Sequence, residues 1–83
     1  MQPDPILREP VVTATAGVSH STLWAKIKNG LYTKPVHIGP RAVGWPSSEV
    51  AALNRAIIAG RSNDEIKELV QRLEAERVAK GDV

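Results

Sequence analysis

Side chains that suit binding to an anionic partner gather between residues 19 and 41 of the 83-residue chain. Hydroxyl groups hydrogen-bond to phosphates or base edges, and lysine and arginine neutralise phosphates and release counterions. The candidate contact residues are Ser19, His20, Ser21, Thr22, Trp24, Lys26, Lys28 and Arg41. Their types predict binding to an anionic partner rather than catalysis.

The residue combinations typical of enzymes and metal sites are not found in the sequence. It has no cysteine, which excludes a disulfide framework, a thiolate zinc finger and a cysteine nucleophile. His20 and His37 alone cannot complete a zinc site of three or four ligands. No glycine-rich phosphate loop or nucleophile–base pair is found, and Asp64 and Glu65 suit the capping of a helix. We therefore expect no enzyme, no cofactor and no metal.

Length and charge narrow the class of protein further. A chain of 83 residues, 42% of them hydrophobic, fits one small domain. No apolar run approaches the about 20 residues that cross a bilayer, and no signal peptide is seen, so we expect a cytoplasmic protein without a membrane partner. Residues 1–45 hold five basic residues against two acidic ones, whereas residues 46–83 hold six against seven. The first half of the chain is therefore expected to face the anionic partner.

A short helix is expected to end at Gly17. Pro10 suits its first turn, where the missing N–H would be unpaired anyway, and Gly17 can supply a left-handed stop. The β-branched run at residues 11–15 favours a strand by propensity. We favour the helix.

A second helix is predicted over residues 20–29, with Ser19 as its N-cap and Gly30 just after its end. Leu23 and Ile27 lie four residues apart and form its buried edge. At about 100° per residue, Ser21, Ala25 and Lys28 point the opposite way, and Trp24 and Lys26 lie on the two flanks. The helix is thus expected to show a small, polar and basic face to solvent.

A short β-hairpin is predicted after this helix. Val36 and Ile38 alternate before a Gly39-Pro40 turn, and Val43 and Trp45 alternate after it. Arg41 falls at the tip, His37 is expected to face solvent, and Trp45 is expected in the core.

Two further helices complete the predicted elements. One starts at residues 46–49 and places Val50, Leu53 and Ile57 on one face, ending at Gly60. Ser62 and Glu65 form a capping box for the last helix, over residues 63–80. Its apolar stripe consists of Ile66, Leu69, Val70 and Leu73.

The order helix, turn, helix, hairpin, helix, helix is that of a winged helix-turn-helix with an added C-terminal helix. The expected fold is mainly α with a small β-hairpin. We expect residues 1–5 to be a disordered tail, residues 6–60 to be a DNA-binding domain and residues 61–83 to be a dimerisation or packing element. In such a unit the second helix enters the DNA major groove with its N-terminal residues at the base edges.

Two sequence blocks resemble one known family. The segment Gly17-Val18-Ser19-His20-Ser21-Thr22-Leu23-Trp24 is similar to the G-[LV]-S-x-[ST]-T-[IL]-[YW] motif of AlpA-like prophage regulators. The second block, from Lys34-Pro35-Val36 through Gly39-Pro40-Arg41-Ala42-Val43-Gly44-Trp45, resembles that family's wing motif. Leu7-Arg8 and Val12 also match. The resemblance covers residues 6–55 and implies a fold of the MerR-like and excisionase-like type.

The resemblance implies binding to double-stranded DNA, by a transcriptional regulator or by an accessory factor in excision of an integrated element. It carries DNA contacts over to Ser21, Thr22 and Trp24 on the helix and to Arg41 on the wing. The chain departs from the family at His20 and Ala25, where basic residues are common, and at Glu9, where the family is usually apolar. The segment after Gly60 matches no family motif.

Several candidates could have a purely structural role in place of a DNA contact. Ser21 and Thr22 could simply relieve unpaired N–H groups in the first helical turn. Trp24 could cover the rim of the core, and His20 could be exposed without a role. Lys26 and Lys28 could be solvated, and Arg41 could pair with a nearby acid.

The last helix leaves two further alternatives open. Its stripe either packs across its own domain or pairs with a second copy, and we favour a homodimer. In a different class of function, an adaptor would grip another protein, such as an integrase, through residues 63–80.

Overall fold

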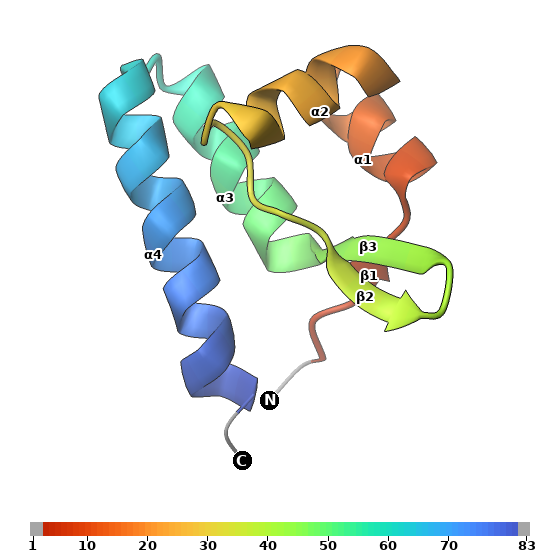
Figure 1. The fold of residues 1–83 in the computed structure, drawn as a ribbon. Coiled ribbons are helices and arrows are strands. Elements are labelled where there is room, and N and C mark those ends of the chain that lie inside the picture. The colour runs from red at the N-terminus through yellow and green to blue at the C-terminus, as the bar shows by residue number, and fades with distance from the viewer. Residues whose placement is uncertain (1–2, 82–83) are drawn as a thin grey trace.

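The computed structural model describes residues 3–81, with side chains described as far as Arg77, and its elements follow the predicted order (Figure 1). They are β1 (Ile6–Leu7), α1 (Glu9–Ala16), α2 (His20–Lys28), β2 (Val36–Gly39), β3 (Ala42–Pro46), α3 (Ser47–Ile58) and α4 (Asn63–Gly81). In the described residues, four helices pack together with a small antiparallel sheet of strand order β1-β3-β2, which lies at one side of the molecule (Figure 1). The predicted fold class, mainly α with a β-hairpin, is confirmed.

Helix α1 forms in spite of its β-branched residues because both of its ends are fixed locally. A proline occupies the first turn, and Gly17 adopts a left-handed conformation with φ 71° and donates its N–H to the carbonyl of Thr13. The Thr13 hydroxyl also donates to backbone carbonyls of the preceding turn, at 3.1 Å. Val12 is fully buried, so this helix contributes to the core.

Helix α2 begins at the predicted N-cap. The Ser19 hydroxyl oxygen accepts a hydrogen bond from the Thr22 N–H at 3.2 Å. The helix ends at Lys28, with Asn29 as its C-cap and Gly30 at φ 76°, one residue earlier than predicted. Leu23 is fully buried.

The hairpin is confirmed, and the sheet gains a strand that was not predicted. Strands β2 and β3 pair antiparallel around a turn that contains Arg41, and β1 pairs with the other edge of β3, with Leu7 opposite Trp45. Gly44 permits this close approach, because a Cβ there would collide with the Ile6 side chain and lie 2.9 Å from the Leu7 carbonyl oxygen. A strand of two residues is too short to show the alternation that identifies a strand in sequence.

Part of the segment expected as a disordered tail is ordered. Met1 and Gln2 lie outside the described residues, but Asp4 accepts hydrogen bonds from the Ser48 N–H at 2.9 Å and the Ser48 hydroxyl at 2.5 Å. The Pro5 carbonyl accepts from the Ser47 N–H at 2.7 Å. The N-cap of α3 is Pro46, which has no side-chain acceptor. Asp4 and Pro5 therefore supply the cap of α3 from outside the helix.

One hydrophobic core joins all four helices to the hairpin. Trp45 is fully buried, as predicted, and its indole N–H donates to the Thr33 carbonyl at 2.9 Å. Ile57 was expected on the buried face of α3 but is 39% exposed, and Ala56 packs against the core in that turn instead. The buried hydrophobic residues are Val12, Leu23, Tyr32, Trp45, Val50, Leu53, Ile66 and Val70.

Helix α4 starts at the predicted capping box and packs into this same core. Ser62 and Glu65 exchange backbone-to-side-chain hydrogen bonds at 3.0 and 3.2 Å. Ile66 is 9% and Val70 4% exposed, and Leu69 and Leu73 pack beside them. The apolar stripe thus packs mainly against its own domain, with Leu69 and Leu73 half-buried. Formation of a homodimer through this helix stays a prediction.

An ion pair fastens α4 to the rest of the fold. Arg77 donates two hydrogen bonds to the Glu49 carboxylate, at 2.6 and 2.7 Å, and a third at 2.6 Å to the Lys34 carbonyl. Glu74 accepts a hydrogen bond from the Lys34 N–H at 2.8 Å. The α2–β2 connection is therefore held by α4.

Among the described residues, no helix combines the length and apolar character needed to cross a membrane.

Candidate nucleic-acid interface

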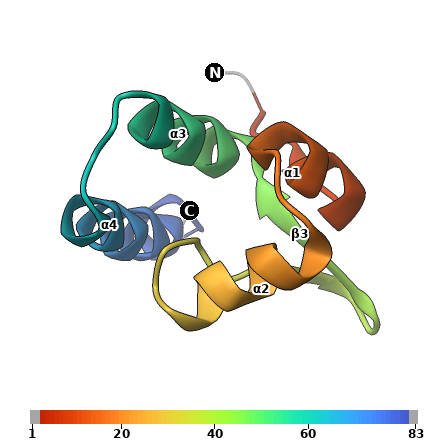
Figure 2. The same cartoon turned by 90° about the horizontal axis from the view of Figure 1, so that it is seen from above.

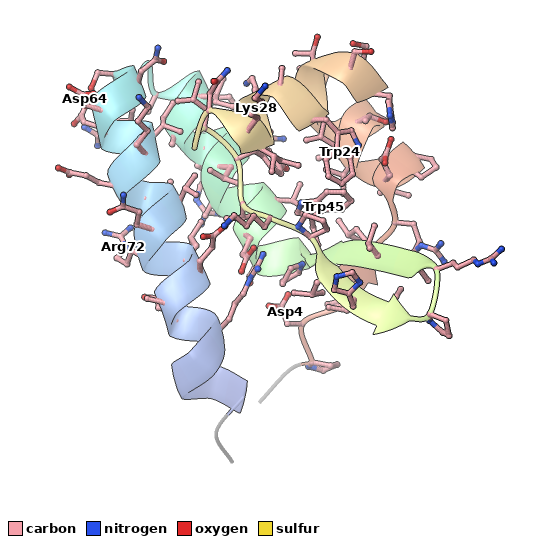
Figure 3. The ribbon with its side chains drawn as sticks, viewed as in Figure 1. Asp4, Trp24, Lys28, Trp45, Asp64 and Arg72 are labelled. Atoms are coloured by element: carbon pink, nitrogen blue, oxygen red, sulfur yellow. The ribbon has the colours of Figure 1, made fainter. Side chains whose placement is uncertain are left out.

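Helix α2 turns its polar face to solvent, as the periodicity predicts. Ser21, Thr22, Ala25 and Lys28 are exposed, and Leu23 is buried on the opposite side. The predicted flank residues, Trp24 and Lys26, are both half-buried. Figure 3 shows Trp24 pointing toward Trp45 and Lys28 lying at the end of α2 nearest α4.

The hydroxyl groups at the start of α2 differ in how many hydrogen bonds they make within the protein. Ser19 accepts from the Thr22 N–H, and its own hydroxyl donates to the Thr22 hydroxyl oxygen at 3.0 Å. Ser19 therefore acts as the helix cap. The Thr22 hydroxyl can still donate, and Ser21 makes no side-chain hydrogen bond to any residue that the structure describes. These two hydroxyls are the ones available to a ligand.

Glu9 ties two of the candidate residues back to α1. One carboxylate oxygen accepts a hydrogen bond from the Trp24 indole N–H at 3.2 Å, and the other is bonded to the His20 ring nitrogen Nδ1. The bond to His20 is the largest cause that lowers the pKa of Glu9, desolvation opposes it, and the bond to Trp24 lowers the pKa further. These bonds give Glu9 a structural role, because they join α1 to the start of α2. Sequence reasoning missed the link because Glu9 is 11 and 15 residues from its partners.

Trp24 also contacts the core of the domain. Its ring meets that of Trp45 edge to face, with centroids 6.1 Å apart. Its half-buried position and its bond to Glu9 favour a structural role for Trp24, in which the ring covers the rim of the core. His20 remains exposed on its outer side, with a side-chain exposure of 70%.

The cations of the candidate interface are unpaired within residues 3–77. Lys26, Lys28 and Arg41 form no salt bridge to a described acidic residue. The acidic partner that would have explained Arg41 structurally is therefore not among these residues. Arg41 is exposed in the β2–β3 turn, which projects from the body of the molecule on the same side as α2 (Figure 2).

The match to known families decides where this chain belongs. The model of the family described as prophage CP4-57 regulatory protein (AlpA) matches residues 5–52. The chain belongs to the AlpA family. This confirms the resemblance carried by the two sequence blocks, and it makes the chain a member of a prophage regulatory family.

One phage relative supports the AlpA assignment. The chain is 40% identical over 55 residues to an uncharacterized protein, ORF88, of Enterobacteria phage P4. The matched part is 66% of this chain and 62% of that relative, which is less than two thirds of its length. No solved structure matches the chain. The AlpA match includes β1, α1, α2, the hairpin and the start of α3, and it stops before α4.

Proposed function

We propose that this AlpA-family protein is a sequence-specific DNA-binding transcriptional regulator. In this proposal α2 lies in the major groove, and Arg41 contacts the minor groove or a phosphate beside it. One observation carries the proposal: an exposed helix face with hydroxyls and a lysine lies on the same side as a projecting turn whose arginine has no ion-pair partner within residues 3–77.

The dimensions of α2 suit this role. An α-helix with its side chains is about 10–12 Å in diameter, and the major groove of B-DNA is about 12 Å wide, so the exposed face of α2 can enter it. Ser21 and Thr22 are in the first turn, where recognition helices contact base edges, and Lys26 and Lys28 are in the last turn, where they reach phosphates. In this arrangement Ser19 and Glu9 position the helix, and His20 and Trp24 lie at the edge of its contact with DNA.

The test is a titration of fluorescent duplex DNA, selected from a random pool, with anisotropy measured from 50 to 200 mM salt. Arg41→Gln and Lys28→Gln each remove one cation, so each is expected to make the slope of log affinity against log salt shallower by about 0.9. Arg55→Gln is the matched control, because Arg55 is exposed and belongs to α3, a helix that lies across the molecule from α2 (Figure 2). Failure of the wild type to bind any duplex at low salt would overturn the proposal.

Excision of an integrated element would use the same contacts to DNA. A reporter gene driven from the selected site measures regulation, and a recombination assay with the attachment site measures excision. A response in the recombination assay alone would replace the regulator with an excision factor and leave DNA binding in place.

A further inference from the structure

Three lysines surround one hollow where the end of α2 meets α4. Lys28 comes from α2, Lys34 from the α2–β2 connection and Lys67 from α4. The hollow has a volume of about 430 Å³. All three side chains are exposed, and none forms a salt bridge with a described acidic residue. Because Lys67 is far from Lys28 and Lys34 in the sequence, the sequence alone did not predict this cluster.

Contacts between α4 and the chain that follows α2 set the positions of Lys34 and Lys67 at the hollow. Gly30 turns the chain with φ 76°, and the Lys67 stem passes over it, with its Cγ 3.9 Å from where a Cβ on Gly30 would lie. The Lys34 N–H and carbonyl are bonded to Glu74 and Arg77 of α4. The three lysines therefore line one hollow because of the tertiary structure, since they belong to three different segments of the chain.

The local charge favours an anion in this hollow. Glu74 is the one carboxylate among its lining residues, and it is already bonded to the Lys34 N–H. Tyr32, also in the lining, adds no negative charge, since burial raises the pKa of its phenol from 10 to about 12, further above neutral pH. A lysine in the last turn stabilises the helix dipole, which accounts for Lys28 but not for Lys34 or Lys67.

The hollow and the hairpin turn lie toward opposite ends of α2. Figures 1 and 2 show the upper end of α4 beside the C-terminal end of α2, and the β2–β3 turn toward the other end of that helix. With α2 in a major groove, the hollow and the turn face different stretches of the phosphate backbones that border the groove.

We infer that α4 is part of the DNA-binding surface: Lys34 and Lys67, together with Lys28, bind a stretch of the phosphate backbone of the duplex other than the one that Arg41 faces. The inference rests on the proposed function and deepens it. It assigns a binding role to a helix that lies outside the region matched by the AlpA family.

The test compares Lys67→Gln with Arg72→Gln, because both remove one exposed cation from α4. Arg72 lies on the outer side of α4, away from α2 (Figure 3). The wild type should bind duplex DNA more tightly than Lys67→Gln, and the ratio of the two affinities should be about 3- to 4-fold greater at 50 mM than at 200 mM salt. Arg72→Gln should bind like the wild type. The double variant Lys34→Gln/Lys67→Gln should reduce the salt slope by about 1.8.

The outcomes separate the inference from the proposed function. Equal salt slopes for Lys67→Gln, Arg72→Gln and the wild type, with Arg41→Gln still impaired, would overturn the inference alone. No DNA binding by the wild type would overturn both. As a second readout, amide chemical shifts of Gly30 and Lys67 should move when duplex is added, and amide spectra of the free variants check that they are folded.

Discussion

The indole rings of Trp24 and Trp45 meet edge to face, with centroids 6.1 Å apart and planes at 65°. Trp24 belongs to α2 and Trp45 to β3, so this contact joins the candidate recognition helix to the strand that carries the wing. Trp24 is in turn bonded to Glu9 of α1. The relative position of helix and wing is therefore fixed in the free protein, which lowers the ordering cost of binding.

Glu9 is expected to make the fold sensitive to acid. The bond to His20 lowers the pKa of the Glu9 carboxyl below its ordinary value of 4.5. A lowered pKa in the folded state means that the stabilisation is complete above the unfolded value and is lost as pH falls through the folded value. The free energy of unfolding of the wild type should thus exceed that of Glu9→Gln at pH 6, and the gap should shrink below about pH 4.5.

Chemical denaturation at a series of pH values measures this gap. Glu76→Gln, a change at an exposed carboxylate of α4, serves as the control and should show a smaller dependence. The indole N–H resonance of Trp24 should shift over the same acidic range. A gap between wild type and Glu9→Gln that stays constant from pH 6 to pH 3 would contradict the prediction.

Arg77→Ala is expected to destabilise the protein strongly. The Glu49 side chain is 5% exposed, and both of its oxygens accept hydrogen bonds from Arg77. Loss of the guanidinium leaves a buried carboxylate without its partner, which costs about 3 kcal/mol. Urea denaturation measures the loss, and Arg72→Ala on the outer side of the same helix should cost less than about 0.5 kcal/mol.

The double variant Glu49→Met/Arg77→Met checks the cause of that loss. It removes both charges, so it should recover much of the stability that Arg77→Ala loses. A double variant as unstable as Arg77→Ala would mean that packing, and not the uncompensated charge, is responsible.

Gly44→Ala is expected to detach β1 from the sheet. The added methyl would overlap the Ile6 side chain and lie 2.9 Å from the Leu7 carbonyl oxygen, so the strand must move. We expect a loss of about 1–3 kcal/mol, the usual cost of overpacking. Thermal unfolding measures it, with Gly39→Ala as the control, because a Cβ at Gly39 meets nothing closer than 3.7 Å. Equal unfolding temperatures for the two variants would contradict this account.

A chain that ends at residue 61 is expected not to fold. It lacks Ile66 and Val70, which belong to the core, and it leaves Glu49 without Arg77. Far-ultraviolet circular dichroism and amide dispersion test this. A chain that ends after Arg77 keeps all three residues and should fold like the full protein. A folded fragment of residues 1–61 would restore the independent domain of residues 6–60 that the sequence suggested.

Local signals in the sequence predicted the helices and the hairpin well. Ser19, Gly17 and the Ser62–Glu65 capping box act within a few residues of their own positions, so their effect is visible in the sequence. The periodicity of α2 also predicted which of its side chains are exposed, because a helix with one buried edge has a defined outer face.

Long-range contacts account for what the sequence did not predict. Asp4 caps a helix 44 residues away, and Arg77 reaches Glu49 over 28 residues and the Lys34 carbonyl over 43. Glu74 and Arg77, at the polar end of α4, are bonded to the α2–β2 connection, which nothing in their sequence neighbourhood indicates. The same kind of contact brings Lys67 to Lys28 and Lys34, so the lysine cluster could not be found from spacing along the chain.

The absence of a side chain at Gly44 has a consequence for comparing family members. A homologue with a larger amino acid at the aligned position has no room for a strand ahead of α1, and it also loses the anchor that brings Asp4 to α3. The residue at this one position of an alignment should therefore predict whether the segment before α1 pairs with the sheet.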